Sequence, residues 1–101
     1  MTHVARREIS EAALTYEALR VGLAKKILLE LSDTVSQISL FPGSFPLLSN
    51  EIRRAQVSVI PYQLFFAVND EFVTLLGFIP ARIDPNRKLQ IIGNRTLFNI
   101  P

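Results

Sequence analysis

The chain has 101 residues, no cysteine and a formal net charge of +2 at pH 7. Its length suits one domain, residues 1–101. The missing cysteines exclude disulfides and thiolate metal sites, and so small a charge does not by itself predict a nucleic-acid-binding protein. The longest strongly apolar uncharged stretch, residues 55–69, contains Pro61 and is shorter than the ~20 residues of a membrane-spanning helix. We expect a soluble, cytoplasmic protein with no membrane partner.

Residues 5–41 carry apolar side chains at helical spacing and predict two helices. Gly22 separates the helices, and Pro42 ends the second one near Phe41. The short turn predicts an antiparallel helical hairpin, whose apolar stripes need another layer to pack against. The stripe of the first helix consists of Ile9, Ala12, Ala13, Tyr16 and Leu19, and that of the second consists of Leu23, Ile27, Leu31, Val35 and Ile38.

The second half of the chain predicts an antiparallel sheet in residues 52–79. A loop of prolines, glycine and serines without regular structure comes first, at 42–50. Residues 52–60 alternate polar and apolar side chains, and residues 62–68 and 72–79 form two further strands joined by the turn Asn69-Asp70-Glu71. Helices followed by strands predict an α+β fold with the hairpin on one sheet face. The tail, residues 80–101, is either a fourth strand or a cover for the sheet.

The last two predicted strands are apolar on both faces, although one face of such a sheet is usually wet. Strict alternation puts Leu75 and Ile79 on the face opposite to Leu76 and Phe78. This surplus apolar face predicts a cover, which is the chain's own tail, a second copy in a homodimer, or a partner protein. The candidate partner-facing residues are Phe65, Leu75 and Ile79.

An ordered set of residues runs from the second helix to the tail. This order resembles the ParE/RelE superfamily of plasmid-stabilisation toxins, which are small bacterial proteins paired with an antitoxin, and the resemblance spans about residues 5–88. It implies a strand before the first helix, where this chain has only residues 1–4. Either the coding sequence begins upstream or a sheet edge is left open. The matching residues are Ile38, Pro42, Phe45-Pro46, Ile52-Arg53-Arg54, Pro61-Tyr62, Leu64, Phe66, Val68, Arg82 and Asp84-Pro85.

The resemblance implies the toxin of a type II toxin–antitoxin pair, with a cognate antitoxin as its partner. ParE-type relatives bind DNA gyrase and trap it on cleaved DNA, which requires a recognition surface and no metal, cofactor or catalytic pair. Arginine suits that task because its planar fork pairs with carboxylates or phosphates. Residues 52–101 carry six basic and three acidic side chains. The candidate target-binding residues are Arg53, Arg54, Arg82, Arg87, Lys88 and Arg95.

RelE-type relatives are endoribonucleases that cut messenger RNA on the ribosome, and they keep a second function open. Such cleavage needs a proton acceptor and a proton donor. The one histidine, His3, lies at an expected frayed end, and Phe98 in the tail has no proton to give. Tyr62 at a strand start is expected to be structural, while Lys88 and Glu51 are substitutes without a supporting pattern. We therefore expect a binding protein, with the ribonuclease as the alternative.

A third interpretation comes from the family's His-x-Arg-Arg-x-Pro motif. Counting back from Pro85, Pro80 stands in the place of the histidine, and Arg82 and Ile83 stand in the places of the two arginines. Lys88 occupies the position of an aromatic residue that often follows. One arginine of the motif remains, which leaves open a degenerate toxin that binds only its antitoxin.

Overall fold

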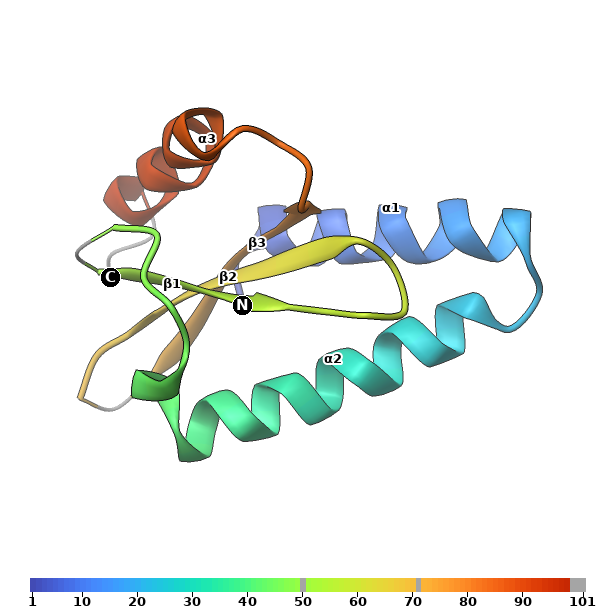
Figure 1. Cartoon of the computed structure of the whole chain (residues 1–101), viewed down its shortest axis with the longest axis horizontal. Coiled ribbons are helices and arrows are strands. Elements are labelled where there is room, and N and C mark those ends of the chain that lie inside the picture. Colours follow the sequence, from blue (N-terminus) through green and yellow to red (C-terminus); the bar gives the residue numbers. More distant parts are fainter. Residues whose placement is uncertain (50, 71, 99–101) are drawn as a thin grey trace.

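The computed structural model describes residues 1–49, 51–70 and 72–98. Two helices precede a three-stranded antiparallel sheet of order β1-β2-β3, and a third helix follows it (Figure 1). The predicted α+β fold is confirmed, but the tail forms a helix and not a fourth strand. The elements are α1 (His3–Leu19), α2 (Leu23–Leu40), a 3₁₀ turn (Pro42–Ser44), β1 (Ile52–Gln56), β2 (Tyr62–Val68), β3 (Val73–Pro80) and α3 (Pro85–Phe98).

The predicted helical hairpin is present, with helix ends set by local chemistry. The Thr2 hydroxyl accepts a hydrogen bond from the Ala5 N–H at 3.0 Å and so caps α1. Gly22 turns the chain with a φ of 95°, which favours glycine. The Glu17 carboxylate accepts from the Gly22 and Ala24 N–H groups at 3.0 Å. The prediction for Leu19 was wrong, because the end of α1 extends beyond the sheet and leaves this side chain 74% exposed (Figure 1).

The larger hydrophobic cluster lies between the hairpin and one face of the sheet. Ile27, Leu31 and Ile38 of the predicted α2 stripe are buried there, and Val35 packs at its edge. The remaining buried members come from α1, from the three strands and from the turn between β1 and β2, so this layer joins the hairpin to the whole sheet. They are Ala5, Ala12, Ala55, Val57, Ile60, Leu64, Phe66, Leu75 and Phe78.

The strand predicted at residues 52–60 ends at Gln56, because Glu30 of α2 binds the following turn. One Glu30 carboxylate oxygen accepts from the Ser58 N–H at 2.7 Å and the Ser58 hydroxyl at 2.8 Å, and the other accepts from the Val59 N–H at 2.9 Å. These backbone donors point to α2 and not to β2. Val57 nevertheless remains buried, so the alternating pattern predicted its burial correctly but not its conformation. Ile60 is buried as well, although strict alternation would put it on the polar face.

Replacing Glu30 with glutamine should weaken the fold in a pH-dependent way. Burial by itself raises the pKa of Glu30, but the hydrogen bonds from Val59 and Ser58 together outweigh it and hold the pKa below its ordinary value of 4.5. This stabilisation is therefore complete above pH 4.5 and is lost as the pH falls through the lowered pKa. We expect Glu30→Gln to cost about 1–2 kcal/mol at pH 7 and less in acid, as measured by urea unfolding. Glu11→Gln on the exposed side of α1 is the control, and an equal cost at both pH values would contradict the account.

The loop at residues 42–50 is more regular than predicted. It begins with the 3₁₀ turn, and its next residues lie along the outer edge of β1, where Leu47 forms an isolated bridge with Arg53. The Pro46 carbonyl accepts from the Arg54 N–H at 3.0 Å, and the Leu48 N–H donates to the Ile52 carbonyl at 2.7 Å. The loop therefore satisfies backbone groups at this edge. Asn50 lies outside the described residues, as does Glu71 in the predicted turn between β2 and β3.

A bulge in β3 changes which side chains share a face of the sheet. Phe65 pairs with Gly77 and Phe66 with Leu75, so Leu76 is an extra residue. Leu75 consequently joins the hairpin-side cluster, whereas Leu76 and Ile79 join a second cluster on the opposite face. The prediction that Leu75 and Ile79 share a face was wrong, because the bulge breaks strict alternation between them.

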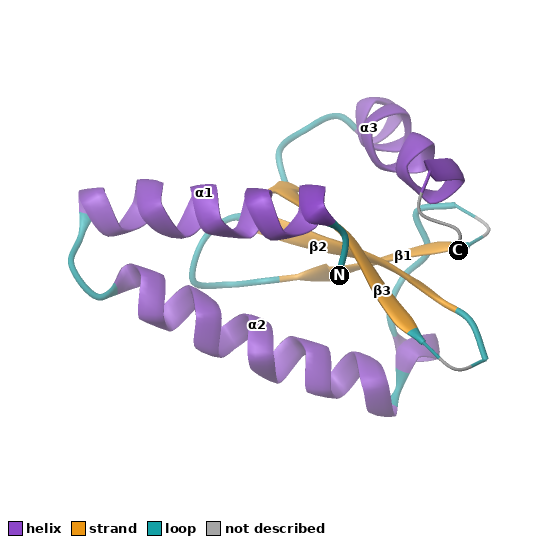
Figure 2. Ribbon diagram, turned by 180° about the vertical axis from the view of Figure 1, so that it is seen from behind, coloured by secondary structure: helices purple, strands orange, loops and turns teal. Residues whose placement is uncertain are grey.

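Helix α3 covers the second face of the sheet, which confirms the tail as the cover. Its start follows from Asp84-Pro85: an Asp84 carboxylate oxygen accepts from the Asn86 N–H at 3.0 Å, and proline suits the first helical turn. Figure 2 shows α3 on the other side of the sheet from α2. Residues 99–101 of the predicted tail lie outside the described residues. The buried members of this second cluster are Ile52, Phe65, Leu76, Ile79 and Ile92.

Candidate functional site

A chain of hydrogen bonds crosses the α3 side of the sheet near the start of α3. Lys88 Nζ donates to Gln63 Oε1 and to the Ala81 carbonyl, both at 2.8 Å. Gln63 Nε2 donates to Gln56 Oε1 at 3.1 Å, and Gln56 Nε2 donates to the Val57 carbonyl at 2.8 Å. We call Arg54, Gln56, Gln63 and Lys88 the sheet-face cluster. Its lysine is held by neutral oxygens.

The position of Lys88 is unusual for a lysine, because only 7% of the residue is exposed. Burial lowers the pKa of Lys88, the positive charge of Arg54 lowers it further, and the Asp84 carboxylate partly opposes both effects. The side chain is thus a desolvated cation beside a second cation. Such an arrangement favours the approach of an anionic group.

Arg54 lies on the same sheet face as Lys88, because it pairs in register with Phe65 of the second cluster. Its side chain is half-buried. One guanidinium nitrogen, Nη1, donates to the Leu47 carbonyl at 3.4 Å, which is longer than a typical N–H···O hydrogen bond. A carboxylate or phosphate would be a stronger acceptor for this guanidinium than that carbonyl.

The buried lysine should make stability rise with pH just below the ordinary lysine pKa of 10.5. Between its lowered folded-state pKa and the ordinary value of 10.5, the unfolded chain binds more protons than the folded chain, so the free energy of unfolding should increase with pH across that window. Lys88→Met removes the titrating group and should flatten this rise. Urea unfolding at several pH values measures it. Lys25→Met, at an exposed site on α2, should keep the wild-type slope, and an unchanged slope in Lys88→Met would contradict the account.

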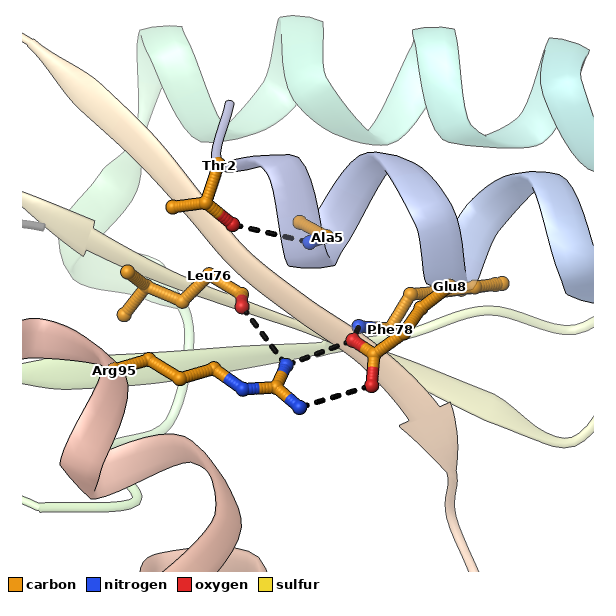
Figure 3. Close-up of polar contacts among 6 residues, drawn as sticks. All are labelled: Thr2, Ala5, Glu8, Leu76, Phe78 and Arg95. Atoms are coloured by element: carbon orange, nitrogen blue, oxygen red, sulfur yellow. Dashed lines mark hydrogen bonds and ion pairs between the residues drawn. The ribbon is translucent and has the colours of Figure 1, made fainter. Parts of the chain in front are cut away.

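Arg95, another predicted target-binding residue, instead fastens α3 to α1 and β3 (Figure 3). Its Nη1 donates to Glu8 Oε1 at 2.8 Å and to the Leu76 carbonyl at 3.0 Å, and its Nη2 donates to Glu8 Oε2 at 3.0 Å. Glu8 Oε1 also accepts from the Phe78 N–H at 3.0 Å. Both charged side chains are largely buried, at 16% and 20% exposed, so this ion pair contributes to the fold.

The other predicted cations lie outside the sheet-face cluster. Arg53 lies opposite Phe66 on the hairpin side, where its Nη1 donates to the Phe45 carbonyl at 2.7 Å. Arg82 and Arg87 are exposed. Of the six predicted cations, the sheet-face cluster therefore contains Arg54 and Lys88, while Arg53 and Arg95 are held in contacts that shape the fold.

The predicted partner-facing residues are covered in this structure. Phe65 and Ile79 lie in the second cluster with Ile92 of α3, and Leu75 lies in the hairpin-side cluster. A second copy or a partner would reach Phe65 and Ile79 only after α3 moved away. Partner contact at these residues stays a prediction that requires such a movement.

Lys88 lies in the sheet-face cluster, but the other predicted acid–base candidates do not join it. His3 is exposed at the start of α1, and Glu51 is exposed before β1. Tyr62 packs with the rings of Tyr16 and Phe78. Burial raises the pKa of Tyr62, as does Tyr16, while Arg82 opposes the shift. Within the described ranges, no three histidine, aspartate or glutamate side chains lie close enough to hold a metal ion.

Sequence patterns did not identify the glutamines of the sheet-face cluster or the glutamate that pairs with Arg95. Gln63 was the one available signal, as a polar residue inside the apolar run of β2. Gln56 looked like an ordinary solvent-facing strand residue, and Glu8 looked like an exposed residue of an amphipathic helix. Their roles depend on the position of α3, which alternation and helical spacing do not give.

Comparison of the chain with protein-family models, with curated proteins and with solved structures finds no match. Among the described helices, none combines the length and apolar character needed to cross a membrane.

Proposed function

We propose that this chain is a ParE/RelE-like toxin of a type II toxin–antitoxin pair, and that it acts by binding DNA gyrase. The resemblance of residues 38–85 motivates the proposal. The helical hairpin packed on a three-stranded antiparallel sheet agrees with part of the architecture that the resemblance implies, but among the described residues no strand precedes α1. The observation that carries it is the buried Lys88, whose ammonium donates to two neutral oxygens and lies close enough to Arg54 for the guanidinium charge to lower its pKa.

The binding role follows from the chemistry of this cationic site. Arg54 keeps donors for an anionic acceptor, and the exposed Arg87 precedes Lys88 on α3. Arg82 is exposed in the turn before α3. Carboxylates of a protein target or phosphates of gyrase-bound DNA would match these groups. A cognate antitoxin carrying carboxylates would compete for the same cations, and this supplies a physical route to neutralisation.

A supercoiling assay with purified DNA gyrase tests this function. We expect the wild-type chain to inhibit supercoiling and to accumulate cleaved DNA. Arg54→Gln and Arg82→Gln should each weaken inhibition at least tenfold, as loss of a charge-assisted hydrogen bond would (about 1.4 kcal/mol per factor of ten). The matched control is Lys25→Gln, which removes one exposed positive charge from the hairpin. No inhibition by folded wild-type protein, or equal inhibition by all variants, would refute the proposed role.

One observation favours ribosome-dependent mRNA cleavage as the second candidate function. Lys88 combines a lowered pKa with a neighbouring guanidinium, so one group could exchange a proton while Arg54 stabilised the phosphate. Incubation of the chain with ribosomes and a bound messenger would test this. Cleavage that disappears in Lys88→Met, and remains low in Lys88→Arg because arginine does not release its proton, would establish it in place of gyrase binding.

A further inference from the structure

An open groove of about 690 Å³ lies at the end of the hairpin-side layer, away from the sheet-face cluster. Apolar side chains from α2, from the β2–β3 turn, from β3 and from Met1 line it, including Val35, Phe72 and Val73. Met1 is 58% exposed and Phe72 is 64% exposed, so the apolar walls continue to the surface. Asp70 is the one charged side chain among the described residues that line the groove.

The groove adjoins the free edge of β3. The sheet order places β3 at an edge, and Figure 2 shows this strand between α1 and α2, with the start of the chain beside it. The Thr2 N–H donates to the Leu75 carbonyl at 3.1 Å, which shows that Leu75 turns its backbone groups outward. In an antiparallel pair the outward groups belong to alternate residues, so Val73 also points outward. Within the described ranges, no other element bonds to the outward groups of Val73.

The rest of the sheet perimeter is occupied. Glu8 accepts from the Phe78 N–H and Arg95 donates to the Leu76 carbonyl, so the second half of the β3 edge is already bonded. The 46–48 segment lies along the outer edge of β1. Among the described residues, the outward backbone groups left at the first half of β3 are therefore the N–H and carbonyl of Val73 and the N–H of Leu75. Both residues also line the apolar groove.

We propose that an extended segment of a partner protein binds here as an added strand beside β3. The N–H and carbonyl of Val73 would pair with the segment, together with the N–H of Leu75, whose carbonyl already accepts from Thr2. Alternate apolar side chains of the segment would enter the groove beside Val35 and Phe72. A lysine or arginine of the segment would meet Asp70. A second copy fits less well, because the open edge is short and α1 flanks it. This inference rests on the edge and the groove, and it does not depend on the toxin function.

Selection from phage displaying random twelve-residue peptides tests the proposal. We expect enrichment of peptides that alternate apolar residues and carry a lysine or arginine. A synthetic copy of the best peptide should bind at least tenfold more weakly to Ser39→Trp, which fills the groove, and at most twofold more weakly to Ser36→Trp, an exposed site on the same helix. Charge reversal in Asp70→Lys should also weaken binding.

Amide exchange and backbone methylation of the peptide identify the binding mode. Bound peptide should slow hydrogen exchange at the amides of Val73 and Leu75, and N-methylation at the peptide's β3-facing residues should weaken binding at least tenfold. The proposal would be overturned by the absence of enriched peptides, by equal binding to Ser39→Trp, or by tolerance of N-methylation. Self-association of the free protein that protects Val73 would identify a second copy as the occupant and would equally overturn the proposal.

Discussion

Gly77→Ala should destabilise the protein, although the substitution adds only one methyl group. A Cβ at this position would lie 2.5 Å from Arg95 Nη1 and from Ile92 Cδ1, and 3.2 Å from Glu8 Oε1. Arg95 is held by Glu8 and by the Leu76 carbonyl, and Ile92 is fully buried. Neither side chain can move without loss of bonds or packing. We expect a cost of about 1–3 kcal/mol, as for other overpacked cores.

Gly93→Ala on α3 is the matched control for this prediction. Nothing lies within 4 Å of a Cβ added at Gly93, and alanine in a helix is more stable than glycine by roughly 0.5–1 kcal/mol. The same chemical change should therefore destabilise at one glycine and stabilise at the other. Thermal and urea unfolding of both variants measure the difference. Equal effects at the two positions would show that α3 does not pack on β3 as described.

Ile92→Ala should cause the larger loss, about 2–5 kcal/mol. Ile92 is the one fully buried side chain that α3 contributes to the second cluster, among the residues whose burial the structure describes. Its truncation leaves a cavity above Phe65 and Leu76 and weakens the packing of α3 on the sheet. We expect a lower unfolding midpoint in urea, together with increased binding of a dye specific for exposed apolar surface.

Leu89→Ala tests whether this effect belongs to the buried side of α3. Leu89 is 38% exposed, so its truncation should change the free energy of unfolding by no more than about 0.5 kcal/mol. The two variants remove similar apolar volumes from side chains of the same helix. A loss at Leu89 as large as that at Ile92 would mean that α3 is rotated or not docked.

The sequence was sufficient to predict the hairpin and the fold class, because helical spacing, Gly22 and Pro42 act locally. It also showed that the sheet has a surplus apolar face. The tail was harder to interpret, since Asn94-Arg95-Thr96 interrupts its apolar pattern. Asp84-Pro85 is nevertheless a local signal for a helix start, as a capping carboxylate followed by proline at the first helical position, and this signal would have predicted α3.

The candidate site could be predicted only in part. A list of cations in the second half of the chain included Arg54 and Lys88, but it could not separate them from Arg53 and Arg95, which stabilise the fold. That distinction depends on long-range contacts, such as the ion pair of Arg95 with Glu8 from the opposite end of the chain. The bulge at Leu76 likewise follows from strand pairing, and alternation alone placed Leu75 on the wrong face.

Pulse labelling after induction of the chain in a bacterial host tests the central claim most directly. Thymidine and methionine incorporation are followed in parallel for the wild type and for Arg54→Gln, with soluble, folded protein verified for both. The account predicts an early fall in thymidine incorporation while methionine incorporation continues, and a much weaker fall with Arg54→Gln. An early fall in methionine incorporation would contradict gyrase as the target, and no change in either label would contradict toxicity itself.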